Sequence, residues 1–326
     1  MLEFRTTGFN GYSVKYSPFY DSRIAVAASA NFGLVGNGRV YPTQDSQYDI
    51  TWSELHEDQA AIACGDGSIK IFDTNVDEFP VRSWQEHKRE VFSVCWNLVD
   101  KDTLCSSSWD GTVKIWRPDV PTSLLTLPTH SCTYSALFSP HHPNLVTSVS
   151  SDSLLRLFDL RAPPSPSGDR LALTIPISNP PSEALTHDWN KYRDNIIATA
   201  GVDRAIRVFD IRAAGHGPIS ELTGHEYAVR RVTWSPHLSD VLLSASYDMT
   251  CRVWSDGSTI TGNIPPTITG GGMGTAKEMG RMSRHTEFVT GVDWCLFGAE
   301  GWCASCGWDE RLAVWDVRAI MAAGSG

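Results

Sequence analysis

The chain has 326 residues, 41% of them hydrophobic and twelve of them tryptophan, which is enough apolar material for a large folded core. No apolar run approaches the roughly 20 residues that a membrane-spanning helix needs, and the start, MLEFRTTG, has neither the basic nor the apolar region of a secretory signal peptide. The net charge of -10 argues against a surface that binds nucleic acid and suits a partner with basic residues, although acidic surfaces are also common among soluble proteins.

The first elements of the chain are predicted to be strands. Leu2-Glu3-Phe4-Arg5 alternates apolar and polar residues, as a half-buried strand does. The segment GYSVKYSP, centred on Tyr16, is predicted to be the next strand, and AVAASANFGLVGNGRVY follows it. These two segments are the front and back halves of a unit that returns along the chain, with Asn31 where the other copies have Asp.

Six further copies of the unit follow. Each front half is an apolar strand that ends in an aromatic residue, at Trp52, Trp96, Phe138, Trp189, Trp234 and Trp294. Each back half runs from small polar residues through an Asp and a β-branched pair, and ends at Asp73, Trp116, Asp159, Asp210, Trp254 and Asp316. This pattern resembles WD40 repeats, whose four-stranded blades stack radially. We expect an all-β, seven-bladed WD40 propeller, a single domain over residues 1–326, closed by pairing of its N- and C-terminal strands.

Two segments depart from the repeat. Residues 162–182 are rich in Pro and Ser, and residues 255–284 contain a Gly run without periodicity. Both are predicted to be surface insertions, between blades 4 and 5 and between blades 6 and 7. Gly270 to Lys277 has the glycines of a phosphate-binding loop but not its Gly-Lys-Ser/Thr ending, so a flexible loop is the better interpretation.

The eight cysteines do not indicate a disulfide framework. Most lie in predicted strands, and a chain of this size does not need disulfides, so reduced thiols are expected. Cys303 and Cys306 have the CxxC spacing, but residues three apart on a strand point to opposite faces. We therefore expect neither a metal site nor any other cofactor.

Histidine, serine and aspartate recur together in three repeats. The sets are His87 with Ser106 or Ser108 and Asp110; His225 with Ser244 or Ser246 and Asp248; and His285 with Ser305 and Asp309. A catalytic triad is built once, whereas these sets repeat. The resemblance to WD40 proteins implies that they brace each blade together with Trp116, Trp254 and Trp315, so no enzymatic activity is expected.

Function is then expected on the narrower face of the propeller. In WD40 proteins this face is formed by the residue before each blade Asp and by the residues six and four before the front-half aromatic. From these positions we predict a peptide-binding set: Tyr12, Tyr48, Glu90, Phe92, Trp109, Glu183, Leu185, Arg230, Tyr247 and Trp308. Large aromatics with two carboxylates suit an amphipathic, positively charged peptide. Alternatively, Trp109, Tyr247 and Trp308 only pack against neighbouring blades.

The first repeat carries a narrower resemblance. Gly8 to Gly38, GFNGYSVKYSPFYDSRIAVAASANFGLVGNG, is similar to the opening of the peroxisomal import receptors for the type-2, N-terminal targeting signal, and the similarity continues through HKREVFSVCWN at His87 to Asn97. The resemblance implies a cytosolic cargo receptor that shuttles to the peroxisome. Its implied partners are matrix proteins with the signal Arg/Lys-Leu-x5-His/Gln-Leu/Ala, a peroxin co-receptor and the peroxisomal docking complex, with no nucleic acid and no membrane insertion.

The resemblance also distributes roles over the predicted face. Glu90 and Glu183 would accept the cationic residue of the signal, and Tyr48, Phe92, Trp109 and Leu185 would contact its apolar side. The alternative is a generic WD40 scaffold, such as a ubiquitin-ligase substrate adaptor or a chromatin subunit. That alternative leaves the Gly8 to Gly38 segment unexplained.

Overall fold

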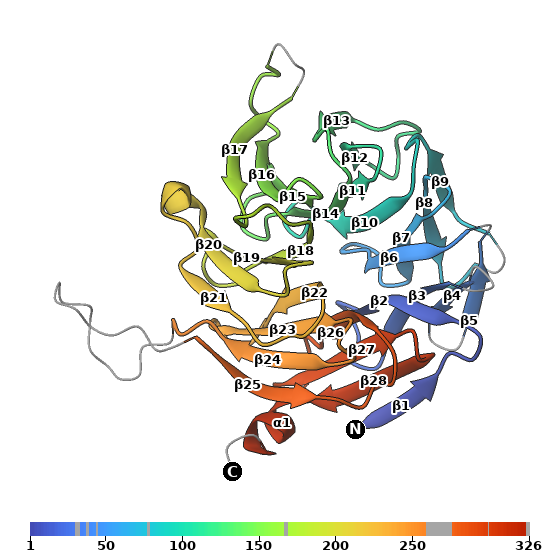
Figure 1. Cartoon of the computed structure of the whole chain (residues 1–326). Coiled ribbons are helices and arrows are strands. Elements are labelled where there is room, and N and C mark those ends of the chain that lie inside the picture. The colour runs from blue at the N-terminus through green and yellow to red at the C-terminus, as the bar shows by residue number, and fades with distance from the viewer. Residues whose placement is uncertain are drawn as a thin grey trace.

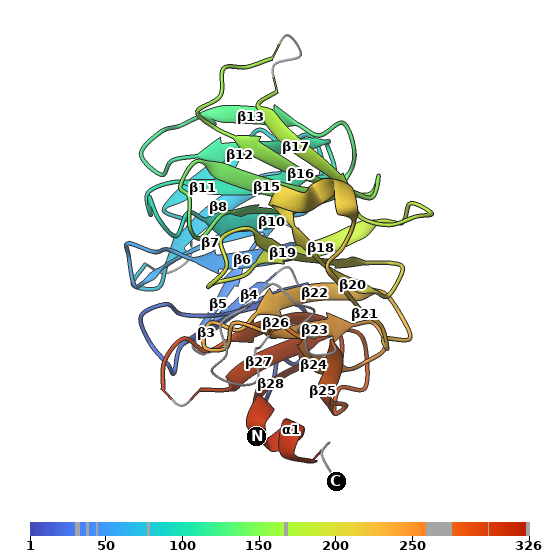
Figure 2. The ribbon, with the colours of Figure 1, turned by 90° about the vertical axis from the view of Figure 1, so that its left-hand side faces the viewer.

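The computed structural model describes residues 1–29, 33–36, 39–43, 45–76, 79–165, 169–258, 276–298 and 300–323. These residues form seven four-stranded antiparallel sheets, arranged as blades around a central axis (Figure 1). Seen from the side, the blades form a layered body with both chain ends at the same edge (Figure 2). The prediction of an all-β WD40-type propeller is confirmed.

Each of the first six blades is a meander whose first strand lies nearest the axis. Blade 1 consists of β2 (Asn10–Tyr16), β3 (Ile24–Ser29), β4 (Gly33–Gly36) and β5 (Arg39–Pro42). Blade 2 consists of β6 (Gln47–Trp52), β7 (Gln59–Cys64), β8 (Ser68–Asp73) and β9 (Arg82–Gln85). Blade 3 consists of β10 (Val91–Trp96), β11 (Leu104–Ser108), β12 (Thr112–Trp116) and β13 (Leu125–Pro128).

The next three blades repeat this order. Blade 4 consists of β14 (Thr133–Phe138), β15 (Leu145–Ser150), β16 (Leu154–Asp159) and β17 (Leu171–Pro176). Blade 5 consists of β18 (Ala184–Trp189), β19 (Ile196–Gly201), β20 (Ile206–Asp210) and β21 (Ser220–Leu222), with the 3-10 helix η1 (Ile211–His216) before β21. Blade 6 consists of β22 (Val229–Trp234), β23 (Val241–Ser246), β24 (Cys251–Ser255) and β25 (Lys277–Met282).

The seventh sheet joins the two ends of the chain. It contains β26 (Val289–Trp294), β27 (Trp302–Gly307) and β28 (Arg311–Asp316), and its outer strand is β1 (Leu2–Arg5). In this pairing Leu2 lies opposite Val314, and Arg5 lies opposite Arg311. The helix α1 (Val317–Ala323) follows β28 and packs against β25 of blade 6. None of the helices in the described ranges is long and apolar enough to cross a membrane.

The core lies between neighbouring blades. The alternating pattern of the back halves turns one set of apolar side chains into each interface, as with Val113 and Ile115 of β12, which are almost completely buried. Phe158 and Phe209 are fully buried, and burying a side chain of this size stabilises a fold by roughly 1.5–3 kcal/mol. The repeat of apolar positions therefore produces a repeat of interfaces.

The recurring histidine sets brace the blades, as predicted. In blade 3, His87 Nδ1 lies 2.9 Å from Asp110 Oδ2, and His87 Nε2 lies 2.8 Å from Ser106 Oγ. The Trp116 indole donates to the same Ser106 Oγ at 2.8 Å, so the hydroxyl is fully engaged. The same bonds recur among His225, Ser244, Asp248 and Trp254, and among His285, Ser305, Asp309 and Trp315.

Both predicted insertions need correction. The segment 162–182 contains β17, and the segment 255–284 contains β25, so each supplies the outer strand of its blade. Leu173 and Ile175 alternate with polar residues in β17, but the adjoining Pro and Ser run indicates a loop, and β25 has no apolar alternation. Residues 166–168 and 259–275 lie outside the described residues, as does Asn31.

The cysteines are all free thiols, as expected. Burial raises the pKa of the Cys306 thiol to about 12, and Cys303 beside it in β27 is also buried. Among the described residues, no cluster of three His, Cys, Asp or Glu side chains could hold a metal ion.

Candidate functional site

A β-bulge stands at the same place in every blade. In each pairing of an inner strand with the next strand, the register skips one residue near the start of the inner strand. The extra residue of a bulge leaves the ladder, and its side chain is re-aimed. The skipped residues are Tyr12, Tyr48, Phe92, Tyr134, Leu185, Arg230 and Thr290, which we call the bulge ring.

The inner strands surround the axis (Figure 1), and each bulge lies near the start of its inner strand, so the seven bulges lie at the same end of the propeller. Contacts between blades support this placement. The Tyr12 and Tyr48 rings lie 5.3 Å apart edge to face, and Tyr48 stacks on Phe92 with a centroid distance of 4.5 Å. Phe92 in turn contacts Tyr134, at 5.6 Å.

The aromatic members of the ring belong to a longer chain of contacting rings. Phe92 also stacks on Trp109, at 4.6 Å. On the other side, Tyr12 contacts Trp308 at 5.8 Å. The complete series, which we call the aromatic arc, is Tyr134, Trp109, Phe92, Tyr48, Tyr12, Trp308, Phe288 and Tyr247. Blade 5 is the one blade that adds no ring to this series, so the arc is open there.

The arc unites six of the predicted residues and adds two. Phe288 satisfies the positional rule but was not selected as a contact residue. Tyr134, which is not in the predicted set, stands four residues before Phe138 and satisfies the same rule. All eight aromatic side chains are half-buried, so each one packs on its neighbours and still reaches solvent.

The two predicted carboxylates lie near the blade 4 end of the arc. Glu183 is exposed and accepts a hydrogen bond from the Tyr134 hydroxyl at 3.1 Å. Burial and the negative charge of Glu183 raise the pKa of Tyr134 above its usual value, so the phenol remains a donor. Glu90 precedes Phe92 by two residues and keeps 34% of its side chain exposed, with Arg89 Nε at 3.5 Å.

Leu185 and Arg230 differ from expectation because they are buried rather than exposed. Only 7% of Leu185 and 6% of Arg230 reach solvent. Both residues occupy the same bulged position as the half-buried aromatics, so the bulge alone does not determine burial.

Deeper in the channel the charges are paired. A cavity of about 200 Å³ is lined there by residues that include Lys15, Asp49 and Arg231. Arg231 donates to Asp49 at 2.5 Å, and Lys15 donates to Asp293 at 3.0 Å. Burial lowers the pKa of His187 in the same wall to about 3, so this histidine is neutral. These ion pairs join inner strands of different blades.

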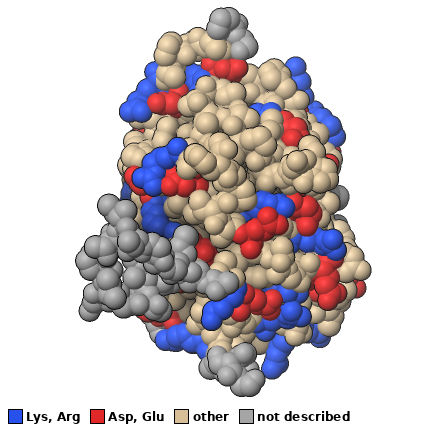
Figure 3. All heavy atoms as spheres, turned by 60° about the vertical axis from the view of Figure 1, so that its left-hand side comes forward, with Lys and Arg blue, Asp and Glu red and all other residues tan. Residues whose placement is uncertain are grey.

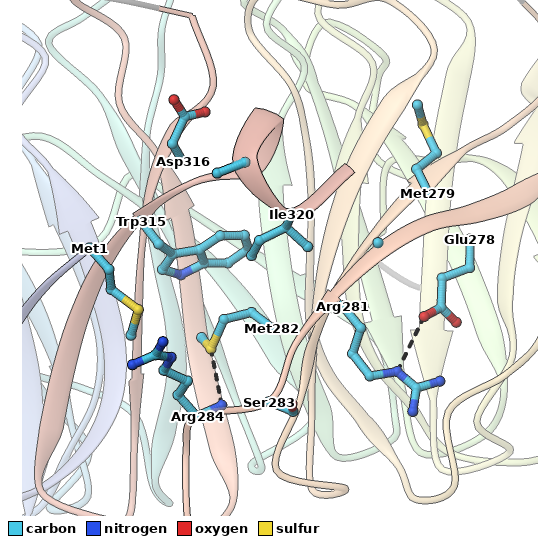
Figure 4. Close-up of a pocket in the computed structure, with 12 residues that line it drawn as sticks. Met1, Glu278, Met279, Arg281, Met282, Ser283, Arg284, Trp315, Asp316 and Ile320 are labelled. Atoms are coloured by element: carbon cyan, nitrogen blue, oxygen red, sulfur yellow. Dashed lines mark hydrogen bonds and ion pairs between the residues drawn. The ribbon is translucent and has the colours of Figure 1, made fainter. Parts of the chain in front are cut away.

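Another pocket lies away from the channel. It has a volume of about 700 Å³ and opens on the outer side of blades 6 and 7, where Met1, Met282, Trp315 and Ile320 converge beneath α1 (Figure 4). Its rim holds Arg281, which donates to Glu278 at 3.2 Å, and none of the predicted site residues lines it. Along the side of the propeller, acidic and basic side chains are interspersed rather than gathered by sign (Figure 3).

Comparisons with known proteins agree with the repeat. The WD40 family (WD domain, G-beta repeat) matches residues 78–117, 121–159, 216–255 and 276–316. The peroxisomal targeting signal 2 receptor of Saccharomyces cerevisiae is 40% identical over 97% of this chain and 99% of its own length. Peroxisome biogenesis protein 7 of Arabidopsis thaliana is 42% identical over 94% of this chain and 95% of its own length. The peroxisomal targeting signal 2 receptor of Mus musculus is 34% identical over 98% of both chains. At these identities over nearly full length, the chain belongs to the family of peroxisomal targeting signal 2 receptors.

Proposed function

We propose that this protein is a non-enzymatic cargo receptor, which binds type-2 N-terminal peroxisomal targeting signals on the face formed by the bulge ring and the aromatic arc. The observation that carries the proposal is the continuous series of eight contacting aromatic rings at one end of the channel. The names of the relatives, which are targeting signal 2 receptors, give the class of ligand.

The size of the face suits the signal. Nine residues in a helix span roughly 13 Å, which fits across a propeller face. A helix uses an apolar stripe to enter a groove, and half-buried aromatics are the residues that most often dominate such contacts. Tyr48, Phe92 and Trp109 form the most closely stacked part of the arc and are proposed to take the leucines of the signal.

Charge gives the direction of the helix. Glu90 and Glu183 lie near the same end of the arc, so the cationic first residue of the signal is proposed to lie between them. Opposite charges attract a ligand and fix its register more than they add affinity.

A helix of nine residues is marginal alone in water, and binding has to supply the ordering free energy. A peroxin co-receptor that covers the bound signal would add apolar contact and offset this cost. We propose that the cargo complex then meets the peroxisomal docking complex, and that the receptor moves between the cytosol and the peroxisome.

Peptide titration tests the proposal. A nonapeptide of the form Arg-Leu-x5-His-Leu should bind the wild-type protein, and Phe92→Ala should weaken that binding at least about tenfold, since it removes the ring between Tyr48 and Trp109. Phe297→Ala is the matched control, because Phe297 is 42% exposed and follows the other end of an inner strand. Absence of wild-type binding, or equal affinities for both variants, would refute the proposal.

A further inference from the structure

Arg230 is the one charged member of the bulge ring. Only 6% of the residue is exposed. Among the described residues, no hydrogen-bond acceptor, carboxylate or aromatic face engages its guanidinium. Buried charges in proteins are normally paired, so an arginine in this state requires an explanation.

The neighbouring residue, Arg231, is buried to a similar extent but is paired. Arg231 is also buried, and it donates to Asp49 and to Ser13 Oγ at 3.0 Å. Asp49 is thereby committed to Arg231. Burial lowers the pKa of Arg230, and the nearby groups that interact with its charge are Tyr247, Arg231, Asp49 and Tyr134.

Among the described residues, neither carboxylate of the face forms an ion pair with Arg230. Glu183 accepts from Tyr134, and Glu90 lies beside Arg89. The ring residues on either side of Arg230 are Leu185 and Thr290, and the Thr290 hydroxyl donates to the Gly11 carbonyl at 2.6 Å. The protein thus presents a largely buried cation for which the described residues supply no ion-pair partner.

We propose that Arg230 is an anion subsite of the signal-binding face, and that it accepts the carboxylate of an Asp or Glu in the five variable positions of the bound signal. This inference rests on the proposed function, because the ligand is the same peptide. Glu90 and Glu183 on blades 3 and 5 receive the cation, and Arg230 on blade 6 receives the anion. A hydrogen bond between a guanidinium and a carboxylate is charge-assisted and stronger than one between neutral groups.

The test uses five pairs of nonapeptides that differ only in Glu or its isostere Gln at one variable position. With the wild-type protein, at least one Glu peptide should bind about tenfold tighter than its Gln partner. Arg230→Gln should bring this ratio to about one while it leaves the Gln peptide within about twofold, and Arg230→Lys should retain part of the preference.

Arg117→Gln is the control, since Arg117 has 45% of its side chain exposed and pairs with Asp102 rather than with a residue of the face, and it should leave the ratio unchanged. A ratio near one at all five positions in the wild type overturns the inference, even if Arg230→Gln does not fold. In that case the Gln peptides still bind and the proposed function stands. If no peptide of either kind binds, both fail.

Discussion

Replacing Glu90 or Glu183 by alanine should weaken binding of an arginine-led signal without unfolding the protein. Coupling energies of close charge pairs across interfaces span about 1.5–7 kcal/mol. Glu90 keeps 34% of its side chain in water and Glu183 is exposed, so both carboxylates lose hydration when they pair. Their effect belongs at the low end, about 1.5 kcal/mol or roughly tenfold in Kd. Exposed charges contribute only about 0–1 kcal/mol to folding, so Tm should stay near that of the wild type.

A double-mutant cycle measures this pairing directly. Glu90→Ala and Glu183→Ala are each titrated by calorimetry with peptides led by Arg and by Ala, and Glu221→Ala on the outer strand β21 is the control. Each site variant should lose about tenfold against the Arg peptide and little against the Ala peptide. Glu90→Arg should reject the Arg peptide and recover part of its affinity with a Glu-led one. Additive effects, with no coupling between receptor and peptide positions, would show that both glutamates are ordinary solvated residues.

Three further predictions concern the fold. Asp110→Ala removes acceptors for His87, Lys88 and Thr112 and should lower the free energy of unfolding by about 1–3 kcal/mol in urea; an equal loss for the exposed Asp119→Ala would contradict the bracing role. Burial tends to raise the pKa of Asp110, but hydrogen bonds from His87 and Thr112 outweigh it and hold this pKa below its usual value. The wild type should therefore lose stability as pH falls below about 4, and Asp110→Ala should lose less. Parallel profiles of stability against pH for the two proteins would refute this. Deletion of residues 1–6 unpairs β28 and should lower Tm and promote aggregation; an unchanged midpoint would contradict the role of β1.

The blades are predictable from the sequence because each copy of the unit has the same pattern of apolar and polar residues. An apolar strand ending in an aromatic, followed by Asp and a β-branched pair, specifies a blade edge by side-chain pattern alone. The outer strands β17 and β25 were missed since they carry weaker alternation, and adjoining runs of Pro, Ser and Gly indicate loops when read locally.

The sequence predicts where the residues of the candidate face lie along each inner strand, but not how deeply their side chains are buried. A constant offset from the front-half aromatic locates all seven bulges, yet the bulged residue is Tyr, Phe, Leu, Arg or Thr, so no residue type signals a bulge. The burial of Leu185 and Arg230 therefore could not be seen in the sequence. The lack of a partner for Arg230 depends on contacts between blades far apart in the chain, which only the three-dimensional arrangement reveals.

At the seven bulges, the choice of side chain can affect ligand specificity with little effect on strand pairing. A bulged residue stands outside the strand ladder, so its identity is not dictated by register, and blades with Tyr, Leu or Arg at this place have the same four strands. Specificity can therefore drift during evolution, or be redesigned, by exchanging a handful of side chains while the blades remain intact. A library randomised at the four half-buried positions, Tyr12, Tyr48, Phe92 and Tyr134, would explore new ligands while the buried members of the ring stay in place.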